Sequence, residues 1–491
     1  MQQTLFDINT KTLEDISTPD TYKGIYSFHK YWGKKPTESI AYFIQNFTNE
    51  TDIVLDPFLG SGLISKECLS RNRRFIGIDI NPFSIEHTNF ILNLPEPSLY
   101  HRAFKEIEKS LKEKINSSYI LENEKIASHY LWKNDNLIKI WMKPETGRSR
   151  IEFEPKQFDL DIISSYSNYE VKNIRDIKFF TNSRINSKPN MTISDIFTKR
   201  ALYNIDLIIN EIKKYPPLIQ RALFLTLTSS SGQMSSMVFA ITGRGKTKNI
   251  ISDKIEVGSW VIGFWRPKLH FEINVWNCFE SRAKKLHKAL LNTEIMSYKT
   301  FYNVDNLLKT NNGATIINSN CLEIMRTLPD KSIKLICTDP PHSDRIPYLE
   351  LSEIWNSILN KNVIFEEEII VSNAKERDKK KTNYIEDMKS LIIESSRVLK
   401  ENGIFLLYYN ARDKQSWKFM EIIASTTDLQ FFGAFPMEYS ANSVVQDNRK
   451  GGMKTDYVLV MKHKNSVILD NHELDKIPGW ITKIPKIEAV A

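Results

Sequence analysis

The strongest constraint on the fold is a strand–loop–helix–strand pattern over residues 53–79. An apolar run leads into a loop that holds Gly60 and Gly62, a helix-like stretch follows, and a second apolar run ends in Asp79. This is the first half of a nucleotide-binding βαβ unit, in which glycines let the backbone approach a ligand and an acid about twenty residues on can bind ribose hydroxyls. The pattern predicts a parallel, helix-covered sheet with a nucleoside-cofactor site at one edge.

The composition of this loop narrows the kind of cofactor. The loop lacks the third glycine of a dinucleotide site, and it contains Asp56 and Phe58 beside the expected ligand. An acid and an aromatic ring suit a cofactor with an amino group and a sulfonium better than one with a pyrophosphate.

A second motif follows a later apolar run, where residues 335–338 lead into Asp339-Pro340-Pro341-His342. Proline fixes its own φ and favours extended geometry in the residue before it, so two prolines hold this loop open. The loop directs one carboxylate, backbone carbonyls and one ring at a shared point. Such a point suits a planar group that carries an NH2.

Together, the two motifs resemble those of DNA amino-methyltransferases that use S-adenosylmethionine to methylate adenine N6 or cytosine N4, with the cofactor motif first. Residues 28–36, 258–282 and 347–355 also look like this family, and the resemblance covers most of residues 20–465. It implies a doubly wound, mostly parallel α/β sheet of the Rossmann-like class I methyltransferase type. It also implies a cofactor site, for which the candidates are His29, Lys30, Tyr31, Asp56, Pro57, Phe58, Gly60, Ser61, Gly62, Asp79, Asn81, Asn320 and Cys321.

The same resemblance assigns catalysis to Asp339, Pro340, Pro341 and His342. Asp339 and a proline-loop carbonyl would bind the amine, and direct attack on the methyl group would need no cysteine nucleophile. The base would be extruded from the duplex and stacked on His342, where the family usually has Tyr, Phe or Trp. Because N4-cytosine enzymes more often have Ser before the prolines, Asp339 favours adenine N6; N4-cytosine stays an alternative.

Charge marks the region between the motifs. Residues 101–300 contain 33 basic and 21 acidic residues, whereas the rest of the chain contains 34 and 38. A basic surface suits phosphate binding, so we expect an inserted domain that contacts double-stranded DNA. The hydroxyl-rich run 229–236 is expected to form a flexible loop against the phosphates, and most aromatic residues over 260–276 are expected in the core. Candidate DNA contacts are Arg244, Lys246, Lys248, Arg266 and Lys268.

These patterns divide the chain into four parts. Residues 1–100 would form an N-terminal arm and the cofactor half of the sheet, and residues 101–300 the basic insertion. Residues 301–465 would form the catalytic half, and residues 466–491 a tail.

Composition limits the classes of protein to which the chain can belong. Apolar content of 41% and charged content of 26% indicate a globular chain, and no apolar run approaches a membrane span. Four scattered cysteines and the lack of a signal pattern indicate a reducing compartment, so we expect a cytoplasmic enzyme without metal. An RNA or tRNA amino-methyltransferase and an inactive DNA-binding relative are the alternatives. A separate restriction or defence subunit would fit the family.

Overall fold

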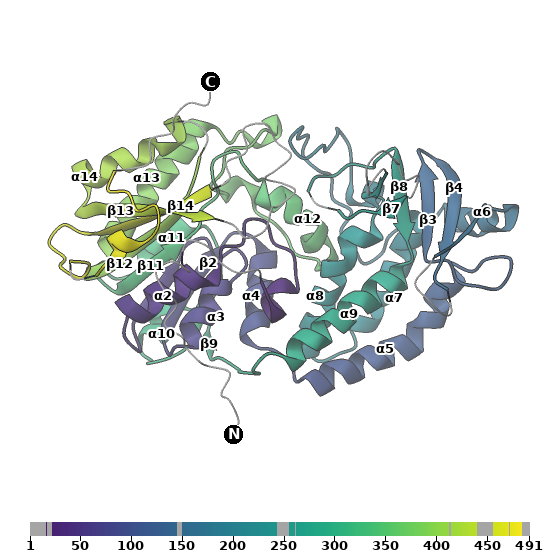
Figure 1. Cartoon of the computed structure of the whole chain (residues 1–491), viewed down its shortest axis with the longest axis horizontal. Helices are drawn as coiled ribbons and strands as arrows, with labels where there is room; N and C mark the ends of the chain where they lie inside the picture. The colour runs from purple at the N-terminus through teal and green to yellow at the C-terminus, as the bar shows by residue number, and fades with distance from the viewer. Residues whose placement is uncertain are drawn as a thin grey trace, which may run out of the picture.

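The computed structural model describes residue 16 and residues 22–144, 150–242, 255–260, 262–411, 414–438, 455–470 and 472–483. Two bodies lie side by side in Figure 1: a large sheet with its helices on the left, and the insertion on the right. Helix α12 (Tyr348–Ile358) lies between them and packs against α4 (Pro82–Leu92) and α8 (Pro217–Met234). The first body contains both sequence motifs.

The large sheet has eight strands in the order β13-β14-β12-β11-β1-β2-β10-β9. Seven of them run in the same direction, and β14 runs antiparallel to its neighbours β12 and β13. This arrangement confirms the predicted doubly wound, mostly parallel α/β sheet. The strands are β1 (Ile53–Asp56), β2 (Arg74–Asp79), β9 (Thr300–Phe301), β10 (Ala314–Asn318), β11 (Ile333–Thr338), β12 (Leu399–Tyr409), β13 (Leu429–Glu438) and β14 (Thr455–His463).

Helices cover both faces of this sheet, because side chains alternate along a strand. Val54 belongs to one hydrophobic cluster, whereas Ile53 and Leu55 belong to another. The first cluster contains apolar residues of α2 (Thr37–Phe47), α3 (Leu63–Leu69) and α4. The second contains those of α10 (Val304–Leu308), α11 (Cys321–Thr327), α13 (Lys381–Val398) and α14 (Ile422–Thr426). The strands are therefore buried on both sides, which leaves their carboxyl ends for a ligand.

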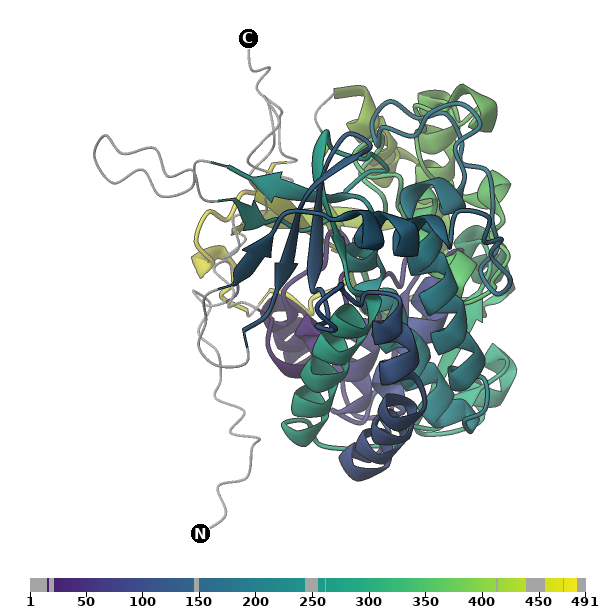
Figure 2. The ribbon, with the colours of Figure 1, turned by 90° about the vertical axis from the view of Figure 1, so that its right-hand side faces the viewer.

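The insertion has its own sheet, antiparallel, in the order β5-β4-β3-β8-β6-β7. Figure 2 shows this sheet and its helices facing the viewer. Its strands are β3 (His129–Lys133), β4 (Asn136–Met142), β5 (Ile151–Phe153), β6 (Val238–Ile241), β7 (Glu256–Val257) and β8 (Leu269–Ile273). Its helices are α5 (Pro97–Ser117), α6 (Gln157–Ser164), α7 (Lys199–Ile212), α8 and α9 (Val275–Leu291). The predicted domain limits stay predictions; the limit at residue 100 falls inside α5.

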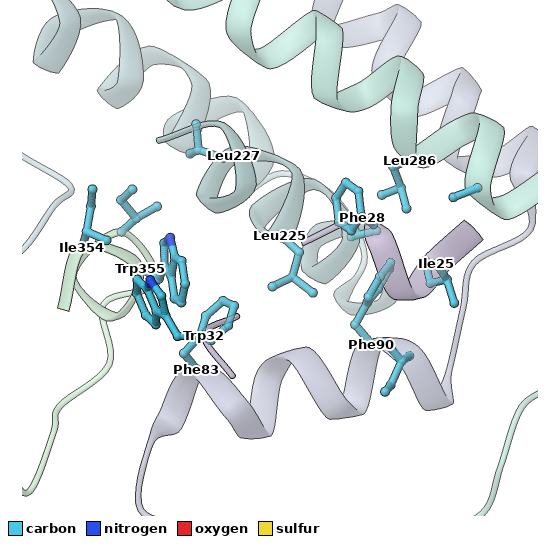
Figure 3. Packing of buried hydrophobic residues seen from close by; sticks show 14 of the residues in the cluster. Ile25, Phe28, Trp32, Phe83, Phe90, Leu225, Leu227, Leu286, Ile354 and Trp355 are labelled. Atoms are coloured by element: carbon cyan, nitrogen blue, oxygen red, sulfur yellow. The ribbon is translucent and has the colours of Figure 1, made fainter. Parts of the chain in front are cut away.

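Apolar side chains join the two bodies. Phe28, which follows the short 3-10 helix η1 (Gly24–Ser27), lies among residues of α4, α8 and α9 in Figure 3. Trp32 stacks on Trp355 of α12 with ring centroids 4.7 Å apart. A tilted ring of α4, Phe83, lies 4.5 Å from the same Trp355 ring. Residues 28–32 are thus held between the large sheet and the insertion.

One local prediction is wrong. The hydroxyl-rich run 229–236 does not form a flexible loop, because most of it belongs to α8. Ser230 and Ser231 are buried, and their hydroxyls donate to carbonyl oxygens one turn back in the helix. Small hydroxyl side chains that satisfy themselves in this way can pack inside a helix bundle.

The remaining local features follow the sequence. Trp260, Phe264, Phe271 and Trp276 are buried, whereas Trp265 is exposed. All four cysteines are buried and free. In the described part of the chain, no helix is long and apolar enough to cross a membrane.

Candidate active site

The two motifs meet in one cavity at the carboxyl ends of β1, β2, β10 and β11. β1 pairs in parallel with both β2 and β11, so the loops that follow these strands open toward the same edge. The cavity lining includes these predicted site residues: Tyr31, Asp56, Pro57, Phe58, Gly60, Ser61, Asp79, Asn81, Asn320, Cys321, Asp339 and Pro341. His29, Lys30, Gly62, Pro340 and His342 are predicted site residues that do not line it.

The glycine loop has the backbone geometry that its sequence requires. Gly60 and Gly62 have φ values of +51° and +72°, which L side chains rarely adopt. A Cβ at Gly62 would also lie 2.2 Å from the Thr88 hydroxyl oxygen of α4. The second glycine therefore packs the loop against a helix, while the first faces the ring of Tyr31.

Asp79 ties this loop to the next turn. Its two carboxylate oxygens accept hydrogen bonds from the backbone N–H of Gly60 (2.7 Å) and of Asn81 (2.8 Å). Burial raises the pKa of Asp79 to about 6, although these two hydrogen bonds lower it. The side chain of Asn81 caps α4 and binds Ser352 of α12, so it serves structure as well as lining the cavity.

Asp56 links the two motifs. Its Oδ1 accepts from the Thr338 hydroxyl at 2.7 Å and from the Phe58 N–H at 3.1 Å. Thr338 directly precedes Asp339, so this contact sets the two loops against each other. Burial raises the pKa of Asp56 to about 8, and the hydrogen bonds from Thr338 and Phe58 oppose the rise.

The far wall of the cavity comes from β10 and α11. The Asn320 side chain accepts from the Leu322 N–H as the helix cap and donates to the Glu367 carbonyl oxygen. Cys321 is buried, and burial raises the pKa of its thiol. Asn320 and Cys321 therefore form a neutral, fixed wall of the cavity.

Lys35 and Asp456 are functional candidates that sequence reasoning missed. Lys35 Nζ lies 2.7 Å from Asp339 Oδ2 and 3.0 Å from Asp456 Oδ2. Lys35 and Asp456 are buried, whereas the Asp339 side chain keeps 21% of its surface exposed. For Lys35, the only indication in the sequence was its place in the segment 28–36, which resembles the family. For Asp456, which lies near the start of β14, the sequence gave no indication.

His342 does not have the placement that stacking would require. Its side chain is 4% exposed and lies edge-on against the Tyr409 ring. Nε2 lies 3.0 Å from Asp339 Oδ1 and 3.2 Å from the Tyr408 carbonyl oxygen. Its ring packs behind the carboxylate, so the expected stacking on a base is wrong for this structure.

The contacts of His342 fix its tautomer. Arg345 Nη1 lies 3.1 Å from His342 Nδ1, and because a guanidinium can only donate, Nδ1 must accept. The proton of the neutral ring is then on Nε2, from which it can be donated to Asp339. Arg345 Nη1 also donates to Asp456 at 2.8 Å. His342 is therefore a fixed donor to the predicted catalytic carboxylate.

The proline loop is held by an aromatic side chain. The Tyr384 hydroxyl donates to the Pro341 carbonyl oxygen at 2.7 Å. This bond fixes the loop. It also occupies one lone pair of a proline-loop carbonyl oxygen, the kind of acceptor that was expected to bind the amine. Tyr31 and Tyr348 stack with ring centroids 6.2 Å apart, and both rings line the cavity.

The predicted DNA contacts divide into two groups. Arg244, Lys246 and Lys248 fall outside the described residues. Arg266 and Lys268 are exposed on the segment before β8, and Arg266 forms an ion pair with Asp135 at 2.6 Å. Among the described residues, no group of three or more His, Cys, Asp or Glu side chains is placed to hold a metal ion.

The strand order and the cavity at the strand ends define an α/β fold of the Rossmann-like class. Residues 7–90 match the N6/N4 methyltransferase family model, which is described as DNA methylase. The match covers this part of the chain only, and the relatives described below are similar to parts of the chain as well. The family implies S-adenosylmethionine as the methyl donor.

Three type II methyltransferases are similar to parts of the chain. M.MjaII of Methanocaldococcus jannaschii is 27% identical over 153 residues, which cover 31% of this chain and 27% of that protein. M.HpaI of Haemophilus parainfluenzae is 35% identical, over 20% of this chain and 31% of that protein. M2.DpnII of Streptococcus pneumoniae is 37% identical, over 14% and 26%. The chain thus spans about a quarter to a third of the length of these relatives.

Proposed function

We propose that the chain transfers a methyl group from S-adenosylmethionine to N6 of adenine in double-stranded DNA. The observation that supports this most is the placement of Asp339 at the cavity that the glycine loop and Asp79 also line. A carboxylate at that point can accept hydrogen bonds from an exocyclic NH2.

The cavity suits the cofactor by charge and by shape. Asp56 and Asp79 lie on its wall with raised pKa values, and burial also raises the pKa of Glu368 there. A ligand with an ammonium and a sulfonium would favour the ionised form of these carboxyl groups. Aromatic side chains complete the wall. S-adenosylmethionine supplies the methyl group on a cationic sulfur.

Asp339 is the group that would bind the amine. Lys35 is paired with one of its oxygens and His342 with the other, so the carboxylate has one orientation. Each oxygen keeps further lone pairs for the incoming NH2. Hydrogen bonds from the amine to Asp339 would favour a tetrahedral nitrogen with its lone pair free to attack, and Asp339 can accept the proton that leaves afterwards.

Lys35 and His342 are positioning residues in this scheme. Lys35 offsets the negative charges of Asp339 and Asp456, which otherwise would oppose each other in a buried site. His342 donates to Asp339 through Nε2, because its other nitrogen accepts from Arg345. The acid is thus preorganised before the base arrives.

Adenine is favoured over cytosine because an Asp, and not a Ser, precedes the two prolines. The test is expression of the whole protein in a methylation-free host, followed by mapping of modified bases in its DNA. N6-methyladenine at a defined sequence is expected, and it should be absent when Asp339→Ala is expressed instead. N4-methylcytosine alone would overturn the adenine assignment, and modified tRNA with unmodified DNA would overturn the choice of substrate.

A further inference from the structure

A turn of the insertion reaches the loop that follows the proline motif. Residues 182–187 lie between α6 and α7, and the backbone groups of Asn182 and Ser187 bond to each other across the turn. From this turn, the Arg184 guanidinium extends to Asp344 and Arg345. The insertion therefore contacts the large sheet's body directly beyond the motif that carries Asp339.

The turn has a fixed backbone. The Asn182 side chain accepts from the Arg184 N–H at 3.0 Å and donates to Glu350 of α12 at 2.7 Å. Ile185 is buried, and its carbonyl oxygen accepts from the Phe264 N–H at 2.6 Å. Arg184 therefore projects from a backbone that is anchored on both bodies of the molecule.

Two of the contacts of Arg184 differ in kind. Its Nη1 lies 2.8 Å from Asp344 Oδ2, but the Asp344 side chain keeps 42% of its surface exposed, and an ion pair of that kind contributes little. Its Nε donates to the Arg345 carbonyl oxygen at 3.1 Å. The second contact acts on the main chain, so it fixes where the backbone of Arg345 lies.

The loop after the motif is one that needs such support. Ser343 has a φ of +56°, which a residue with a side chain adopts at a cost and keeps only where its surroundings hold it. The Arg345 N–H donates to the His342 carbonyl oxygen at 3.2 Å, and the Ser343 hydroxyl accepts from Ser416 at 3.0 Å. The bond from Arg184 is the contribution of the insertion to this support.

The supported loop carries the group that orients His342. Arg345 Nη1 lies 3.1 Å from His342 Nδ1 and donates to Asp456 at 2.8 Å. On the other side of the ring, His342 Nε2 lies 3.0 Å from Asp339 Oδ1. A shift of the Arg345 backbone would carry its guanidinium away from His342 and so release the ring from Asp339.

We propose that Arg184 is a positioning residue for methyl transfer. It fixes the backbone of Arg345, through which His342 stays oriented as a donor to Asp339. The insertion then supports the acid in addition to any contact that it makes with DNA. The effect on the methylation rate rests on the proposed function, whereas the effect on the His342 ring does not.

The first experiment measures methyl transfer to DNA by the full chain with Arg184→Gln and Arg184→Lys. Both variants should lower kcat about tenfold, the value of the one hydrogen bond to a charged group that Arg184 supports, and leave KM for DNA unchanged. Arg184→Lys keeps the charge but places a methylene where Nε was, so it loses the bond to the carbonyl oxygen. Asp344→Ala is the matched control, because it removes only the exposed ion pair, and should keep kcat.

The kinetics can overturn the proposal in two ways. One is an unchanged kcat in Arg184→Gln. The other is a higher KM in Arg184→Gln with normal values in Arg184→Lys, which would make Arg184 a contact to the DNA phosphates and not a positioning residue.

The second experiment is independent of methylation. Nitrogen NMR of the full chain with isotope-labelled histidine rings should show His342 with a proton on Nε2 and none on Nδ1, and His342→Phe, which lacks the signal, assigns it. The signal should move in Arg184→Gln toward that of a ring that exchanges between its tautomers, and should stay in place in Asp344→Ala. An unmoved signal in a folded Arg184→Gln would overturn the proposal; if the melting curve shows that this variant does not fold, Arg184→Lys decides.

Together the two experiments separate this proposal from the proposed function. A signal that moves, in a protein that methylates no DNA, would refute the function and keep the positioning of His342. Methylated DNA with an unmoved signal and an unchanged kcat would keep the function and refute the role of Arg184.

Discussion

Two ion pairs, one in each body of the molecule, each join a buried cation to a carboxylate and differ in their surroundings. In the insertion, Arg200 Nε lies 2.9 Å from Glu272 Oε1, with both side chains 1% exposed. The guanidinium also lies over the rings of Tyr119 and Tyr130. In the large sheet, Lys35 pairs with Asp339, whose side chain keeps 21% of its surface. The first pair is closed by the core, whereas the second has an acid that a ligand can reach.

This difference separates stability from function. A closed pair can only orient the elements that supply it, here α7 and β8. An open acid can exchange a protein contact for one with a substrate. The comparison predicts that changes at the first pair affect folding and that changes at the second affect methyl transfer.

The largest effect is expected at Asp339. Asp339→Ala should lower the rate of methyl transfer at least about 10²–10³-fold, the usual effect of removing one preorganised polar group from a transition state. Transfer of labelled methyl groups to DNA measures it. Lys35 keeps Asp456 as a partner, so the melting temperature should change little. Asp344→Ala, which removes a nearby but half-exposed acid, is the control and should keep its activity. An active Asp339→Ala would refute the site.

The closed pair should show the opposite result. Arg200→Met leaves Glu272 buried without its cation, and should cost about 3–5 kcal/mol of folding free energy. Denaturant unfolding measures this loss. The double variant Arg200→Met with Glu272→Leu removes both charges and should recover much of it. If Arg200→Met were as stable as the unchanged protein, the pair would not be closed as described.

Variants of His342 test whether its hydrogen bond orients Asp339. His342→Phe removes the donor to Asp339 and should lower kcat about tenfold, the value of one hydrogen bond to a charged group. KM for DNA should not change, because the ring does not line the cavity. His342→Gln, which keeps a donor, should recover part of kcat. A stacking role predicts the reverse, since Phe would stack better than Gln.

The smallest predicted effect is a release of protons when the cofactor binds. Burial holds the pKa of Asp56 at about 8, so most of this carboxyl is protonated at pH 7. A cationic ligand would lower that pKa and release part of a proton. Calorimetry in two buffers of different ionisation enthalpy measures the release. It should decrease in Asp56→Asn, and equal heats in both buffers for the unchanged protein would contradict it.

The same pKa sets the sign of a stability effect. Because the folded-state pKa of Asp56 lies above the unfolded value of about 4, its contribution to stability is fully present below pH about 4. That contribution is lost as the pH rises through about 8. Asp56→Asn should therefore flatten the fall of the melting temperature over this range.

The sequence predicts most of what is local. The glycine loop, Asp79 and the strands at 53–56, 74–79 and 333–338 follow from apolar runs and turn residues. The cavity wall from Asp56 to Ser61 follows as well, because neighbouring parallel strands place their following loops together.

What could not be predicted depends on contacts between distant residues. Asp456 reaches Lys35 only because β14 enters the sheet beside β12. The ring of His342 turns toward Asp339 because Arg345 and the Tyr408 carbonyl oxygen hold its two nitrogens. Likewise, the hydroxyl-rich run 229–236 resembles a loop until the helices around α8 bury it.

The pairing of Val54 with Leu335 has a consequence for synthesis of the protein. During translation, β1 has no neighbour on its β11 side until the whole insertion has left the ribosome. The described strands and helices of the insertion are continuous in sequence. The insertion can therefore fold while the large sheet still lacks β11 and the strands beyond it. Closing so long a loop slows assembly of the sheet. A nascent chain that ends before β11 would hold only part of the cavity wall and no Asp339, so the complete cavity arrives only with the last third of the polypeptide.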